Sequence, residues 1–270
     1  MATRQLFREK TITTNFSVKP RSSNRTASSS ISSTASKNAI VSGPVRTQTE
    51  SCVLIKRVLA ASISTICHLR GVFPSDCFTE KRLPDGSSVK VITGYQNGVV
   101  CPDAMSLARI LQGVFDALDK KYLRSLLLGI SCHPDPNVVD ESYTFNFEYD
   151  SAGAPTMTVS NGGTEARPLR KQSFAATKES ITQMMQRLSF LVSQLESFDS
   201  PPDVTVKLLY YDDRTPKEYE PSGFTADSTD HFIFNGPVIS QSCVKSVATK
   251  FHTIASSFCS TKSISENTGM

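Results

Sequence analysis

The sequence has 270 residues, 39% of them hydrophobic, which is enough for one large domain or two small ones with a hydrophobic core. We expect neither a membrane-spanning helix nor a secretory signal, because no apolar run approaches the roughly 20 residues that a membrane helix needs and the N-terminus lacks an apolar block. The seven cysteines include no CxxC pair, which disfavours a disulfide framework and a closely spaced zinc site, so we predict reduced, mostly buried thiols.

The net charge of +4 is concentrated at the N-terminus. Residues 1–48 contain eight Lys or Arg and one Glu, whereas residues 49–270 contain 21 basic and 24 acidic side chains. Since residues 1–48 are also poor in large apolar residues, we predict that they form a disordered, basic, Ser/Thr-rich tail. A phosphorylatable tail and a mitochondrial transit peptide both fit the composition, but the missing amphipathic stripe favours the tail.

A long helix is predicted to follow the tail. Thr47 and Glu50 have the spacing of a capping box, and Gly71 suits the left-handed position after a helix end. Residues 53–67 are apolar on nearly every side, so we expect neighbouring elements to cover this helix. A turn at 84–86 then precedes a short strand at 89–93.

The middle of the sequence alternates helices and strands. A second helix is predicted to begin near Pro102, a favourable first-turn residue, and a buried strand to follow in "LRSLLLGIS". In "ESYTFNFEYD" aromatic residues alternate with polar ones, which predicts a half-buried strand, paired in a hairpin with "PTMTVS". Such a stripe can also stack RNA bases, but its acidic neighbours favour core packing.

The third predicted helix spans residues 174–198 and carries an apolar stripe at steps of three and four residues. Pro201 and Pro202 are predicted to end it. A coiled coil is the alternative, but fewer than three heptads followed by the strand "DVTVKLLYY" favour packing onto a sheet. The pattern as a whole indicates an α+β or mixed α/β domain with one sheet.

Motifs for catalysis are missing. The sequence contains no GxxxxGK[ST], GxGxxG, HExxH or GxSxG. Cys132 and His133 are adjacent and would point to opposite faces of a strand, and Asp212 and Asp213 fall in a predicted loop. We therefore predict no enzyme, no cofactor and no metal site.

After the last clear strand comes the irregular "DDRTPKEYEPSGFTADSTD", followed by the strand-like "HFIFNGPVIS" and by "CVKSVATKFHTIASSF". A connection of about 20 irregular residues inside a domain is unusual and is often functional. The remaining chain is too short for a second core, so we expect these pieces to pack back on the first one.

At this point the sequence resembles a family. The stretches "SCVLIKRVLAASISTICHLRGVFP", "CFTEKRL", "DALDKKYLRSLLLGI", "YTFNFEY" and "TPKEYEPSGF", with "FIFNG" and "KFHTI" after them, are similar to a HORMA domain of the meiotic chromosome-axis type. The resemblance runs from about residue 50 to 254 with these motifs in order.

The resemblance implies an α+β fold with three helices packed on a mostly antiparallel sheet. It further implies a HORMA domain at 49–259, whose C-terminal "safety belt" at 212–259 wraps an extended partner peptide, the closure motif, and a short tail at 260–270. The peptide would add a strand to the edge at 204–210, with the helix at 174–198 behind it. Nine candidate peptide-binding residues follow: Val204, Val206, Lys207, Leu208, Tyr210, Tyr219, Phe224, Phe232 and Phe234. Of these, we predict that Tyr219 and Phe224 anchor the irregular connection to the domain.

The implied function is that of a non-enzymatic meiotic adaptor in the nucleus, on meiotic chromosomes, supporting synapsis, recombination and checkpoint signalling. Its implied partners are closure motifs of axis proteins or other HORMA proteins, and an AAA+ ATPase with its adaptor; chromatin association would be indirect, and no membrane is involved. The short stretch after the belt suggests either a short isoform or a chain that only receives motifs from others. A spindle-checkpoint or translesion-polymerase HORMA protein and a nucleic-acid-binding protein acting through the basic tail remain the alternatives.

Overall fold

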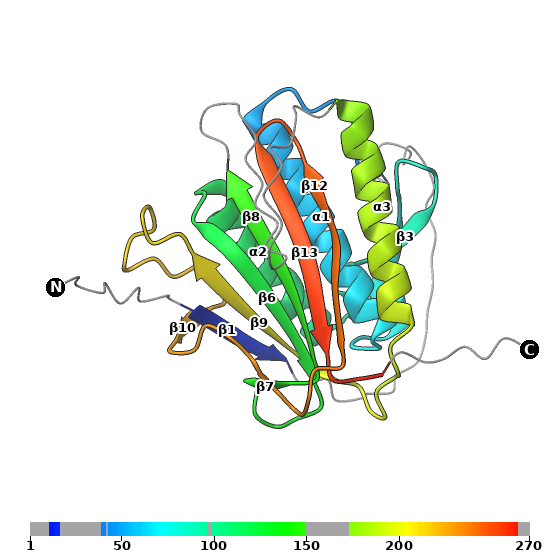
Figure 1. Ribbon diagram of the computed structural model, residues 1–270, viewed down its shortest axis with the longest axis vertical. Helices are drawn as coiled ribbons and strands as arrows, with labels where there is room; N and C mark the ends of the chain where they lie inside the picture. Colours follow the sequence, from blue (N-terminus) through cyan, green and yellow to red (C-terminus); the bar gives the residue numbers. More distant parts are fainter. Residues whose placement is uncertain (1–10, 17–38, 42, 97–98, 150–172, 264–270) are drawn as a thin grey trace, which may run out of the picture.

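The computed structural model describes residues 11–16, 39–41, 43–96, 99–149 and 173–263. Three helices pack on a seven-stranded sheet (Figure 1): α1 (Gln48–Leu69), α2 (Pro102–Asp119) and α3 (Phe174–Ser193). The predicted α+β fold, three helices on a mostly antiparallel sheet with a C-terminal belt, is confirmed.

The strands of the large sheet lie in the order β10-β1-β9-β6-β8-β13-β12, and every neighbouring pair is antiparallel. Their bounds are β1 (Thr11–Phe16), β6 (Leu123–Ser131), β8 (Glu141–Tyr149), β9 (Asp203–Tyr210), β10 (Thr225–Asp227), β12 (Ser240–Ala248) and β13 (His252–Ser260). Three two-stranded sheets and a short helix flank it: β2 (Phe78–Arg82) with β3 (Ser88–Ile92), β4 (Tyr95–Gln96) with β5 (Val99–Val100), β7 (Val138–Val139) with β11 (Ile233–Phe234), and η1 (Ser75–Cys77).

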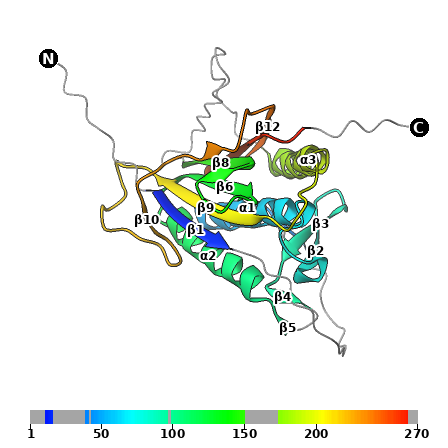
Figure 2. The same cartoon turned by 90° about the horizontal axis from the view of Figure 1, so that it is seen from below.

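The three helices lie on one side of the twisted sheet (Figure 2), with α2 next to β1 and α3 next to β12. Helix α1 lies between them and is the centre of the core, with Val58, Leu59 and Ile63 fully buried. Its N-terminus has the predicted capping box: the Thr47 hydroxyl accepts from the Glu50 N–H, and the Glu50 carboxylate accepts from the Thr47 N–H.

Helix α1 is long and apolar enough to cross a membrane, contrary to our expectation that no run approaches that length. However, 67% of its most apolar window is buried inside the protein, as we expected for a helix covered by its neighbours. The membrane-like composition is therefore that of a core helix. Among the cysteines, three are buried, two are intermediate and two are exposed, so the prediction of mostly buried thiols is only partly right.

Helix α3 ends at Ser193, before the predicted end at residue 198. The apolar spacing continues to Leu195 because this side chain, 4% exposed, still packs in the core from the irregular segment after the helix. The Arg70 guanidinium donates to the carbonyls of Leu195 and Glu196 and forms a buried ion pair with Glu141. These bonds satisfy two carbonyls that follow the end of the helix and have no helical partner.

The aromatic stripe faces the core, as the acidic neighbours predicted. Tyr143, Phe145 and Phe147 are at most 2% exposed, and the Tyr149 hydroxyl donates to the Leu123 carbonyl at 2.8 Å. None of these three buried rings is available to stack a base. The predicted hairpin partner at 155–160 lies outside the described residues.

One strand of the large sheet comes from the segment that the sequence predicts to be disordered. Residues 11–16 form β1, which lies between β9 and β10. Residues 11–13 pair with β10 and residues 13–16 pair with β9, so the prediction of disorder does not hold for these six residues. For the rest of the tail it stays a prediction, and residues 17–38 lie outside the described part.

Candidate peptide-binding groove between strand β9 and the belt

The belt, residues 212–259, runs around both edges of the sheet (Figure 1). It leaves the end of β9 and returns as β10, which lies outside β1 at one edge of the sheet. It then passes the lower end of the sheet as β11 and forms β12 and β13 at the other edge. Strand β1 lies in the groove between β9 and β10 and pairs with both, through four residues of β9 and three of β10. The groove therefore holds an extended segment by backbone pairing on both sides.

Most of the candidate side chains of β9 point into the core. Val204, Val206, Leu208 and Tyr210 are at most 2% exposed and belong to the hydrophobic core under the sheet. Since backbone N–H and C=O groups lie in the plane of the sheet, these four residues present their backbone to an occupant of the groove. Their role in peptide binding stays a prediction, and the burial of their side chains limits that role to main-chain pairing.

Lys207 is the exception in this strand, because its fully buried ammonium reaches the belt. Its Nζ donates to Asn137 Oδ1 at 2.7 Å, to Thr229 Oγ1 at 2.6 Å and to Asp227 Oδ2 at 3.1 Å, and it lies 5.2 Å from the centre of the Phe232 ring. We call these five residues the Lys207 cluster. Asp227 ends β10, two strands away from β9, so the ion pair spans the position of the intervening strand. The cluster joins core and belt across the groove.

The two aromatic residues of the irregular segment both contact α2, as predicted for anchors. The Tyr219 hydroxyl donates to Asp116 Oδ2 at 2.7 Å, and its ring meets the edges of Tyr122 and Tyr210 at 5.0 and 5.6 Å. Phe224 is 6% exposed and packs against Gly113, where an added Cβ would lie 3.2 Å from its ring. The same Cβ would lie 2.4 Å from the Ser222 carbonyl oxygen, so α2 needs a glycine here for the belt to approach.

Phe232 and Phe234 lie where the belt passes the lower end of the sheet. The Phe232 ring packs on Gly129, where an added Cβ would come within 2.8 Å of it. Phe234 pairs with Val139 in the parallel β7–β11 ladder, and neither phenylalanine belongs to β10. Of the nine candidate residues, these two hold the belt rather than line the groove.

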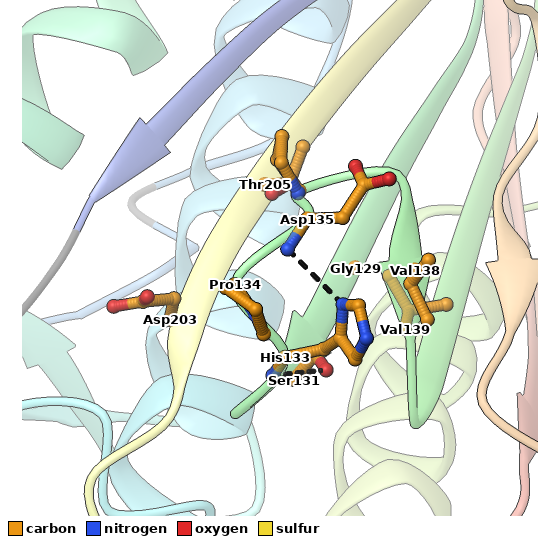
Figure 3. Close-up of a pocket in the computed structure, with 10 residues that line it drawn as sticks. Gly129, Ser131, His133, Pro134, Asp135, Val138, Val139, Asp203 and Thr205 are labelled. Carbon is orange, nitrogen blue, oxygen red and sulfur yellow. Dashed lines mark hydrogen bonds between the residues drawn. The ribbon is translucent and has the colours of Figure 1, made fainter.

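A hollow of about 60 Å³ lies beside β9, lined in part by Thr205 and Asp203 (Figure 3). The 131–136 turn forms its wall, because His133 Nδ1 accepts from the Asp135 N–H at 3.0 Å and the His133 N–H donates to Ser131 Oγ. The Cys132 thiol lies instead near the Ser200 carbonyl, at 3.6 Å. Cys132 and His133 therefore form no nucleophile–base pair, and the hollow has room only for a few water molecules.

Sequence reasoning missed a second contact between belt and core. At the β12–β13 turn, His252 Nδ1 lies 2.6 Å from Ser51 Oγ at the start of α1, and Ser51 Oγ lies 2.6 Å from Thr249 Oγ1. All three side chains are buried, and the His252 ring meets Tyr149 edge-on. The only signal in the sequence was a histidine between Phe251 and Thr253 in the "KFHTI" stretch.

We expect the attachment at His252 to weaken in acid. Burial, with a smaller contribution from Lys121, lowers the pKa of His252 to about 4, so the folded protein keeps the imidazole neutral. The unfolded chain takes up this proton near pH 6.5, whereas the folded protein does so only near pH 4. The free energy of unfolding therefore keeps its full value above pH 6.5 and falls by about 3 kcal/mol in total as the pH is lowered to 4. Urea unfolding between pH 7 and 4.5 measures it: His252→Gln should flatten the profile relative to the unchanged chain. His231→Gln, at an exposed histidine, should leave the profile as it is.

Comparison with known proteins places the chain in a family. The HORMA domain model matches residues 51–252. HORMA domain-containing protein 1 of Bos taurus is 33% identical over 244 residues, which cover 90% of this chain and 60% of the relative. The Homo sapiens protein of the same name is 34% identical over 210 residues, covering 77% and 51%. The chain thus spans about half to three fifths of the length of these relatives.

Solved structures agree on the fold. C. elegans HTP-2 bound to HTP-3 closure motif 1 superposes with a TM-score of 0.69 at 18% identity, covering 90% of this chain and 98% of that one. A chain in the crystal structure of the mitotic checkpoint complex gives a TM-score of 0.55 at 15% identity, covering 78% of this chain and 98% of that one. The chain is therefore a member of the HORMA domain family, with HORMA domain-containing protein 1 among its relatives.

Proposed function

We propose that this protein is a meiotic chromosome-axis adaptor that captures closure-motif peptides in the groove between β9 and the belt. The observation that carries the proposal is an extended strand held between β9 and β10, with the belt continuing around the sheet to β12 and β13. Backbone pairing would supply affinity, as in other cases of strand addition. The Lys207 cluster and the α2 contacts would slow release, because the belt must open before a strand can leave.

The family relation supports a binding module rather than an enzyme. Among the residues that the structure describes, no group of three or more His, Cys, Asp or Glu is placed to hold a metal. HTP-2 has been solved bound to closure motifs of HTP-3 and HIM-3. By analogy, the partners proposed here are closure motifs of axis proteins or of other HORMA proteins, with location in the nucleus on meiotic chromosomes.

Belt opening also calls for a remodelling activity. The belt contacts α1, α2 and both edges of the sheet, so its detachment breaks several buried contacts at once. We propose, as the family resemblance implies, that an AAA+ ATPase with its adaptor supplies this work and that chromatin association is indirect. The belt then has two arrangements whose populations depend on the peptide and on the ATPase.

A peptide array tests the proposal. The full chain is incubated with overlapping peptides from meiotic axis proteins, including the HTP-3 and HIM-3 closure motifs, beside scrambled peptides and peptides from mitotic checkpoint proteins. We expect discrete axis segments to bind and their scrambled versions to fail. Preferential binding of checkpoint peptides would instead favour the spindle-checkpoint branch, and no discrete binding at all would overturn peptide capture.

A further inference from the structure

The strand that occupies the groove belongs to the same chain. We propose that residues 11–16 are an internal occupant that competes with closure-motif peptides for the β9 edge. The inference rests on the proposed function for the identity of its competitor, but not for its own geometry. Thr13 pairs with Lys207 on one side and with Thr225 of β10 on the other, while the residues before it pair with β10 and those after it with β9, so β1 bridges the two strands.

The local sequence suits this position. Four of the six residues in "TITTNF" are the β-branched residues Thr or Ile, which favour extended backbone, whereas nine of the 22 residues at 17–38 are Ser. The segment is also short, and only four of its residues pair with β9. A strand of this length holds the groove by few hydrogen bonds, which is what a displaceable occupant requires.

Occupation of the groove by β1 covers strand edges that an empty groove would leave exposed. An empty groove would expose the N–H and C=O groups of β9 and β10 on facing edges, and exposed strand edges promote aggregation. Because β1 is covalently attached to the domain, its occupancy does not fall when the protein is diluted, unlike that of a peptide from another molecule. The chain would thus remain with its belt closed until a stronger peptide displaces β1.

The Lys207 cluster fits either occupant. Its ion pair joins β9 to the end of β10 through the side chains of Lys207 and Asp227, across the position that the backbone of an occupant takes. The same cluster can therefore close over residues 11–16 or over a partner peptide in the same register. Exchange between the two occupants requires this cluster to open, so the internal strand sets the rate at which partner peptides enter.

The test disrupts β1 in the full-length chain. Thr13→Pro with Thr14→Pro removes two consecutive N–H donors, which point to opposite neighbours in a strand, so pairing is weakened on both sides. The matched control is Ser29→Pro with Ser30→Pro in the Ser-rich part of the same N-terminal segment. The probe is a fluorescein-labelled peptide of residues 8–19, used beside the best axis peptide from the array.

We expect the Thr13/Thr14 variant to take up both peptides at least about tenfold faster than the unchanged chain and the Ser29/Ser30 control. Amide hydrogen exchange of residues 204–210 should also rise in the Thr13/Thr14 variant alone when no peptide is present. Uptake rates that are independent of protein concentration support occupation within one molecule, whereas β9 protection that falls on dilution points to exchange between copies and overturns the internal arrangement.

The outcomes separate this inference from the proposed function. If axis peptides bind all three proteins at the same rate and β9 exchange is unchanged, the internal occupant is wrong while peptide capture stands. If β9 becomes exposed in the Thr13/Thr14 variant and the residue 8–19 peptide restores its protection, but no axis peptide binds, the internal occupant is supported and the proposed function fails.

Discussion

Replacing Lys207 with methionine is expected to accelerate release of a bound peptide about 100-fold. Methionine keeps most of the volume but removes the ammonium to which Asn137, Asp227 and Thr229 bond. Removing one partner of a buried ion pair costs about 3 kcal/mol or more, and 1.4 kcal/mol corresponds to a factor of ten. Because these bonds cross the groove, the loss falls on the closed belt. Dissociation of a labelled array peptide, chased with unlabelled peptide, gives the rate.

The control for this variant is Lys245→Met. Lys245 is an exposed belt residue on β12 that bonds Gln183 of α3, and it lies at the opposite edge of the sheet from the groove. Its replacement makes the same chemical change and should alter the release rate less than twofold, since exposed contacts contribute little. A lower melting temperature for Lys207→Met with unchanged release would mean that the cluster stabilises the fold without holding the belt.

The sequence predicted best those features that depend on local order. The Thr47 capping box and the alternation from Tyr143 to Tyr149 each require only neighbours along the chain, and both are present in the structure. The belt was predicted through the family resemblance, and its aromatic anchors because Tyr219 and Phe224 are rare apolar groups in a polar segment. These contacts follow from composition once the segment is known to return to the domain.

Features that depend on distant pairing were missed or misassigned. Strand β1 looks like part of a polar tail, because its partner β9 lies about 190 residues further along the chain. Lys207 was included among the candidate residues, but the alternating pattern of strand β9 does not reveal that its ammonium reaches across the groove to Asp227. The hydrogen bond between His252 and Ser51 joins residues 201 positions apart. Such contacts exist only once the belt is in place, which is why they mark its closed arrangement.

The second large effect is expected from Tyr219→Ala combined with Phe224→Ala. Truncating a buried phenylalanine costs about 3–5 kcal/mol, and loss of the hydroxyl bond to Asp116 adds about 1.5 kcal/mol or more. We expect peptide release at least about 100-fold faster and trypsin cleavage after Arg214 and Lys217 to accelerate. The helical circular dichroism signal should persist, because the two rings pack on α2 and on Tyr122 and Tyr210, at the side of the domain away from α3. Tyr95→Ala with Phe190→Ala, at exposed rings, is the control and should change neither rate.

A substitution on α2 approaches the same contact from the other side. Gly113→Ala favours the helix itself by up to about 1 kcal/mol, yet its Cβ would overlap the Ser222 carbonyl oxygen. The substitution therefore has opposite effects on the helix and on the belt. We expect α2 to become more stable, while trypsin cleavage at Lys217 and peptide release become faster. Gln112→Ala, at the exposed neighbouring position, should change neither the cleavage nor the release. Faster release in both the aromatic double variant and Gly113→Ala would locate the control of release at the belt–α2 contact. Unchanged release in both would leave Tyr219 and Phe224 as surface packing without a part in holding the peptide.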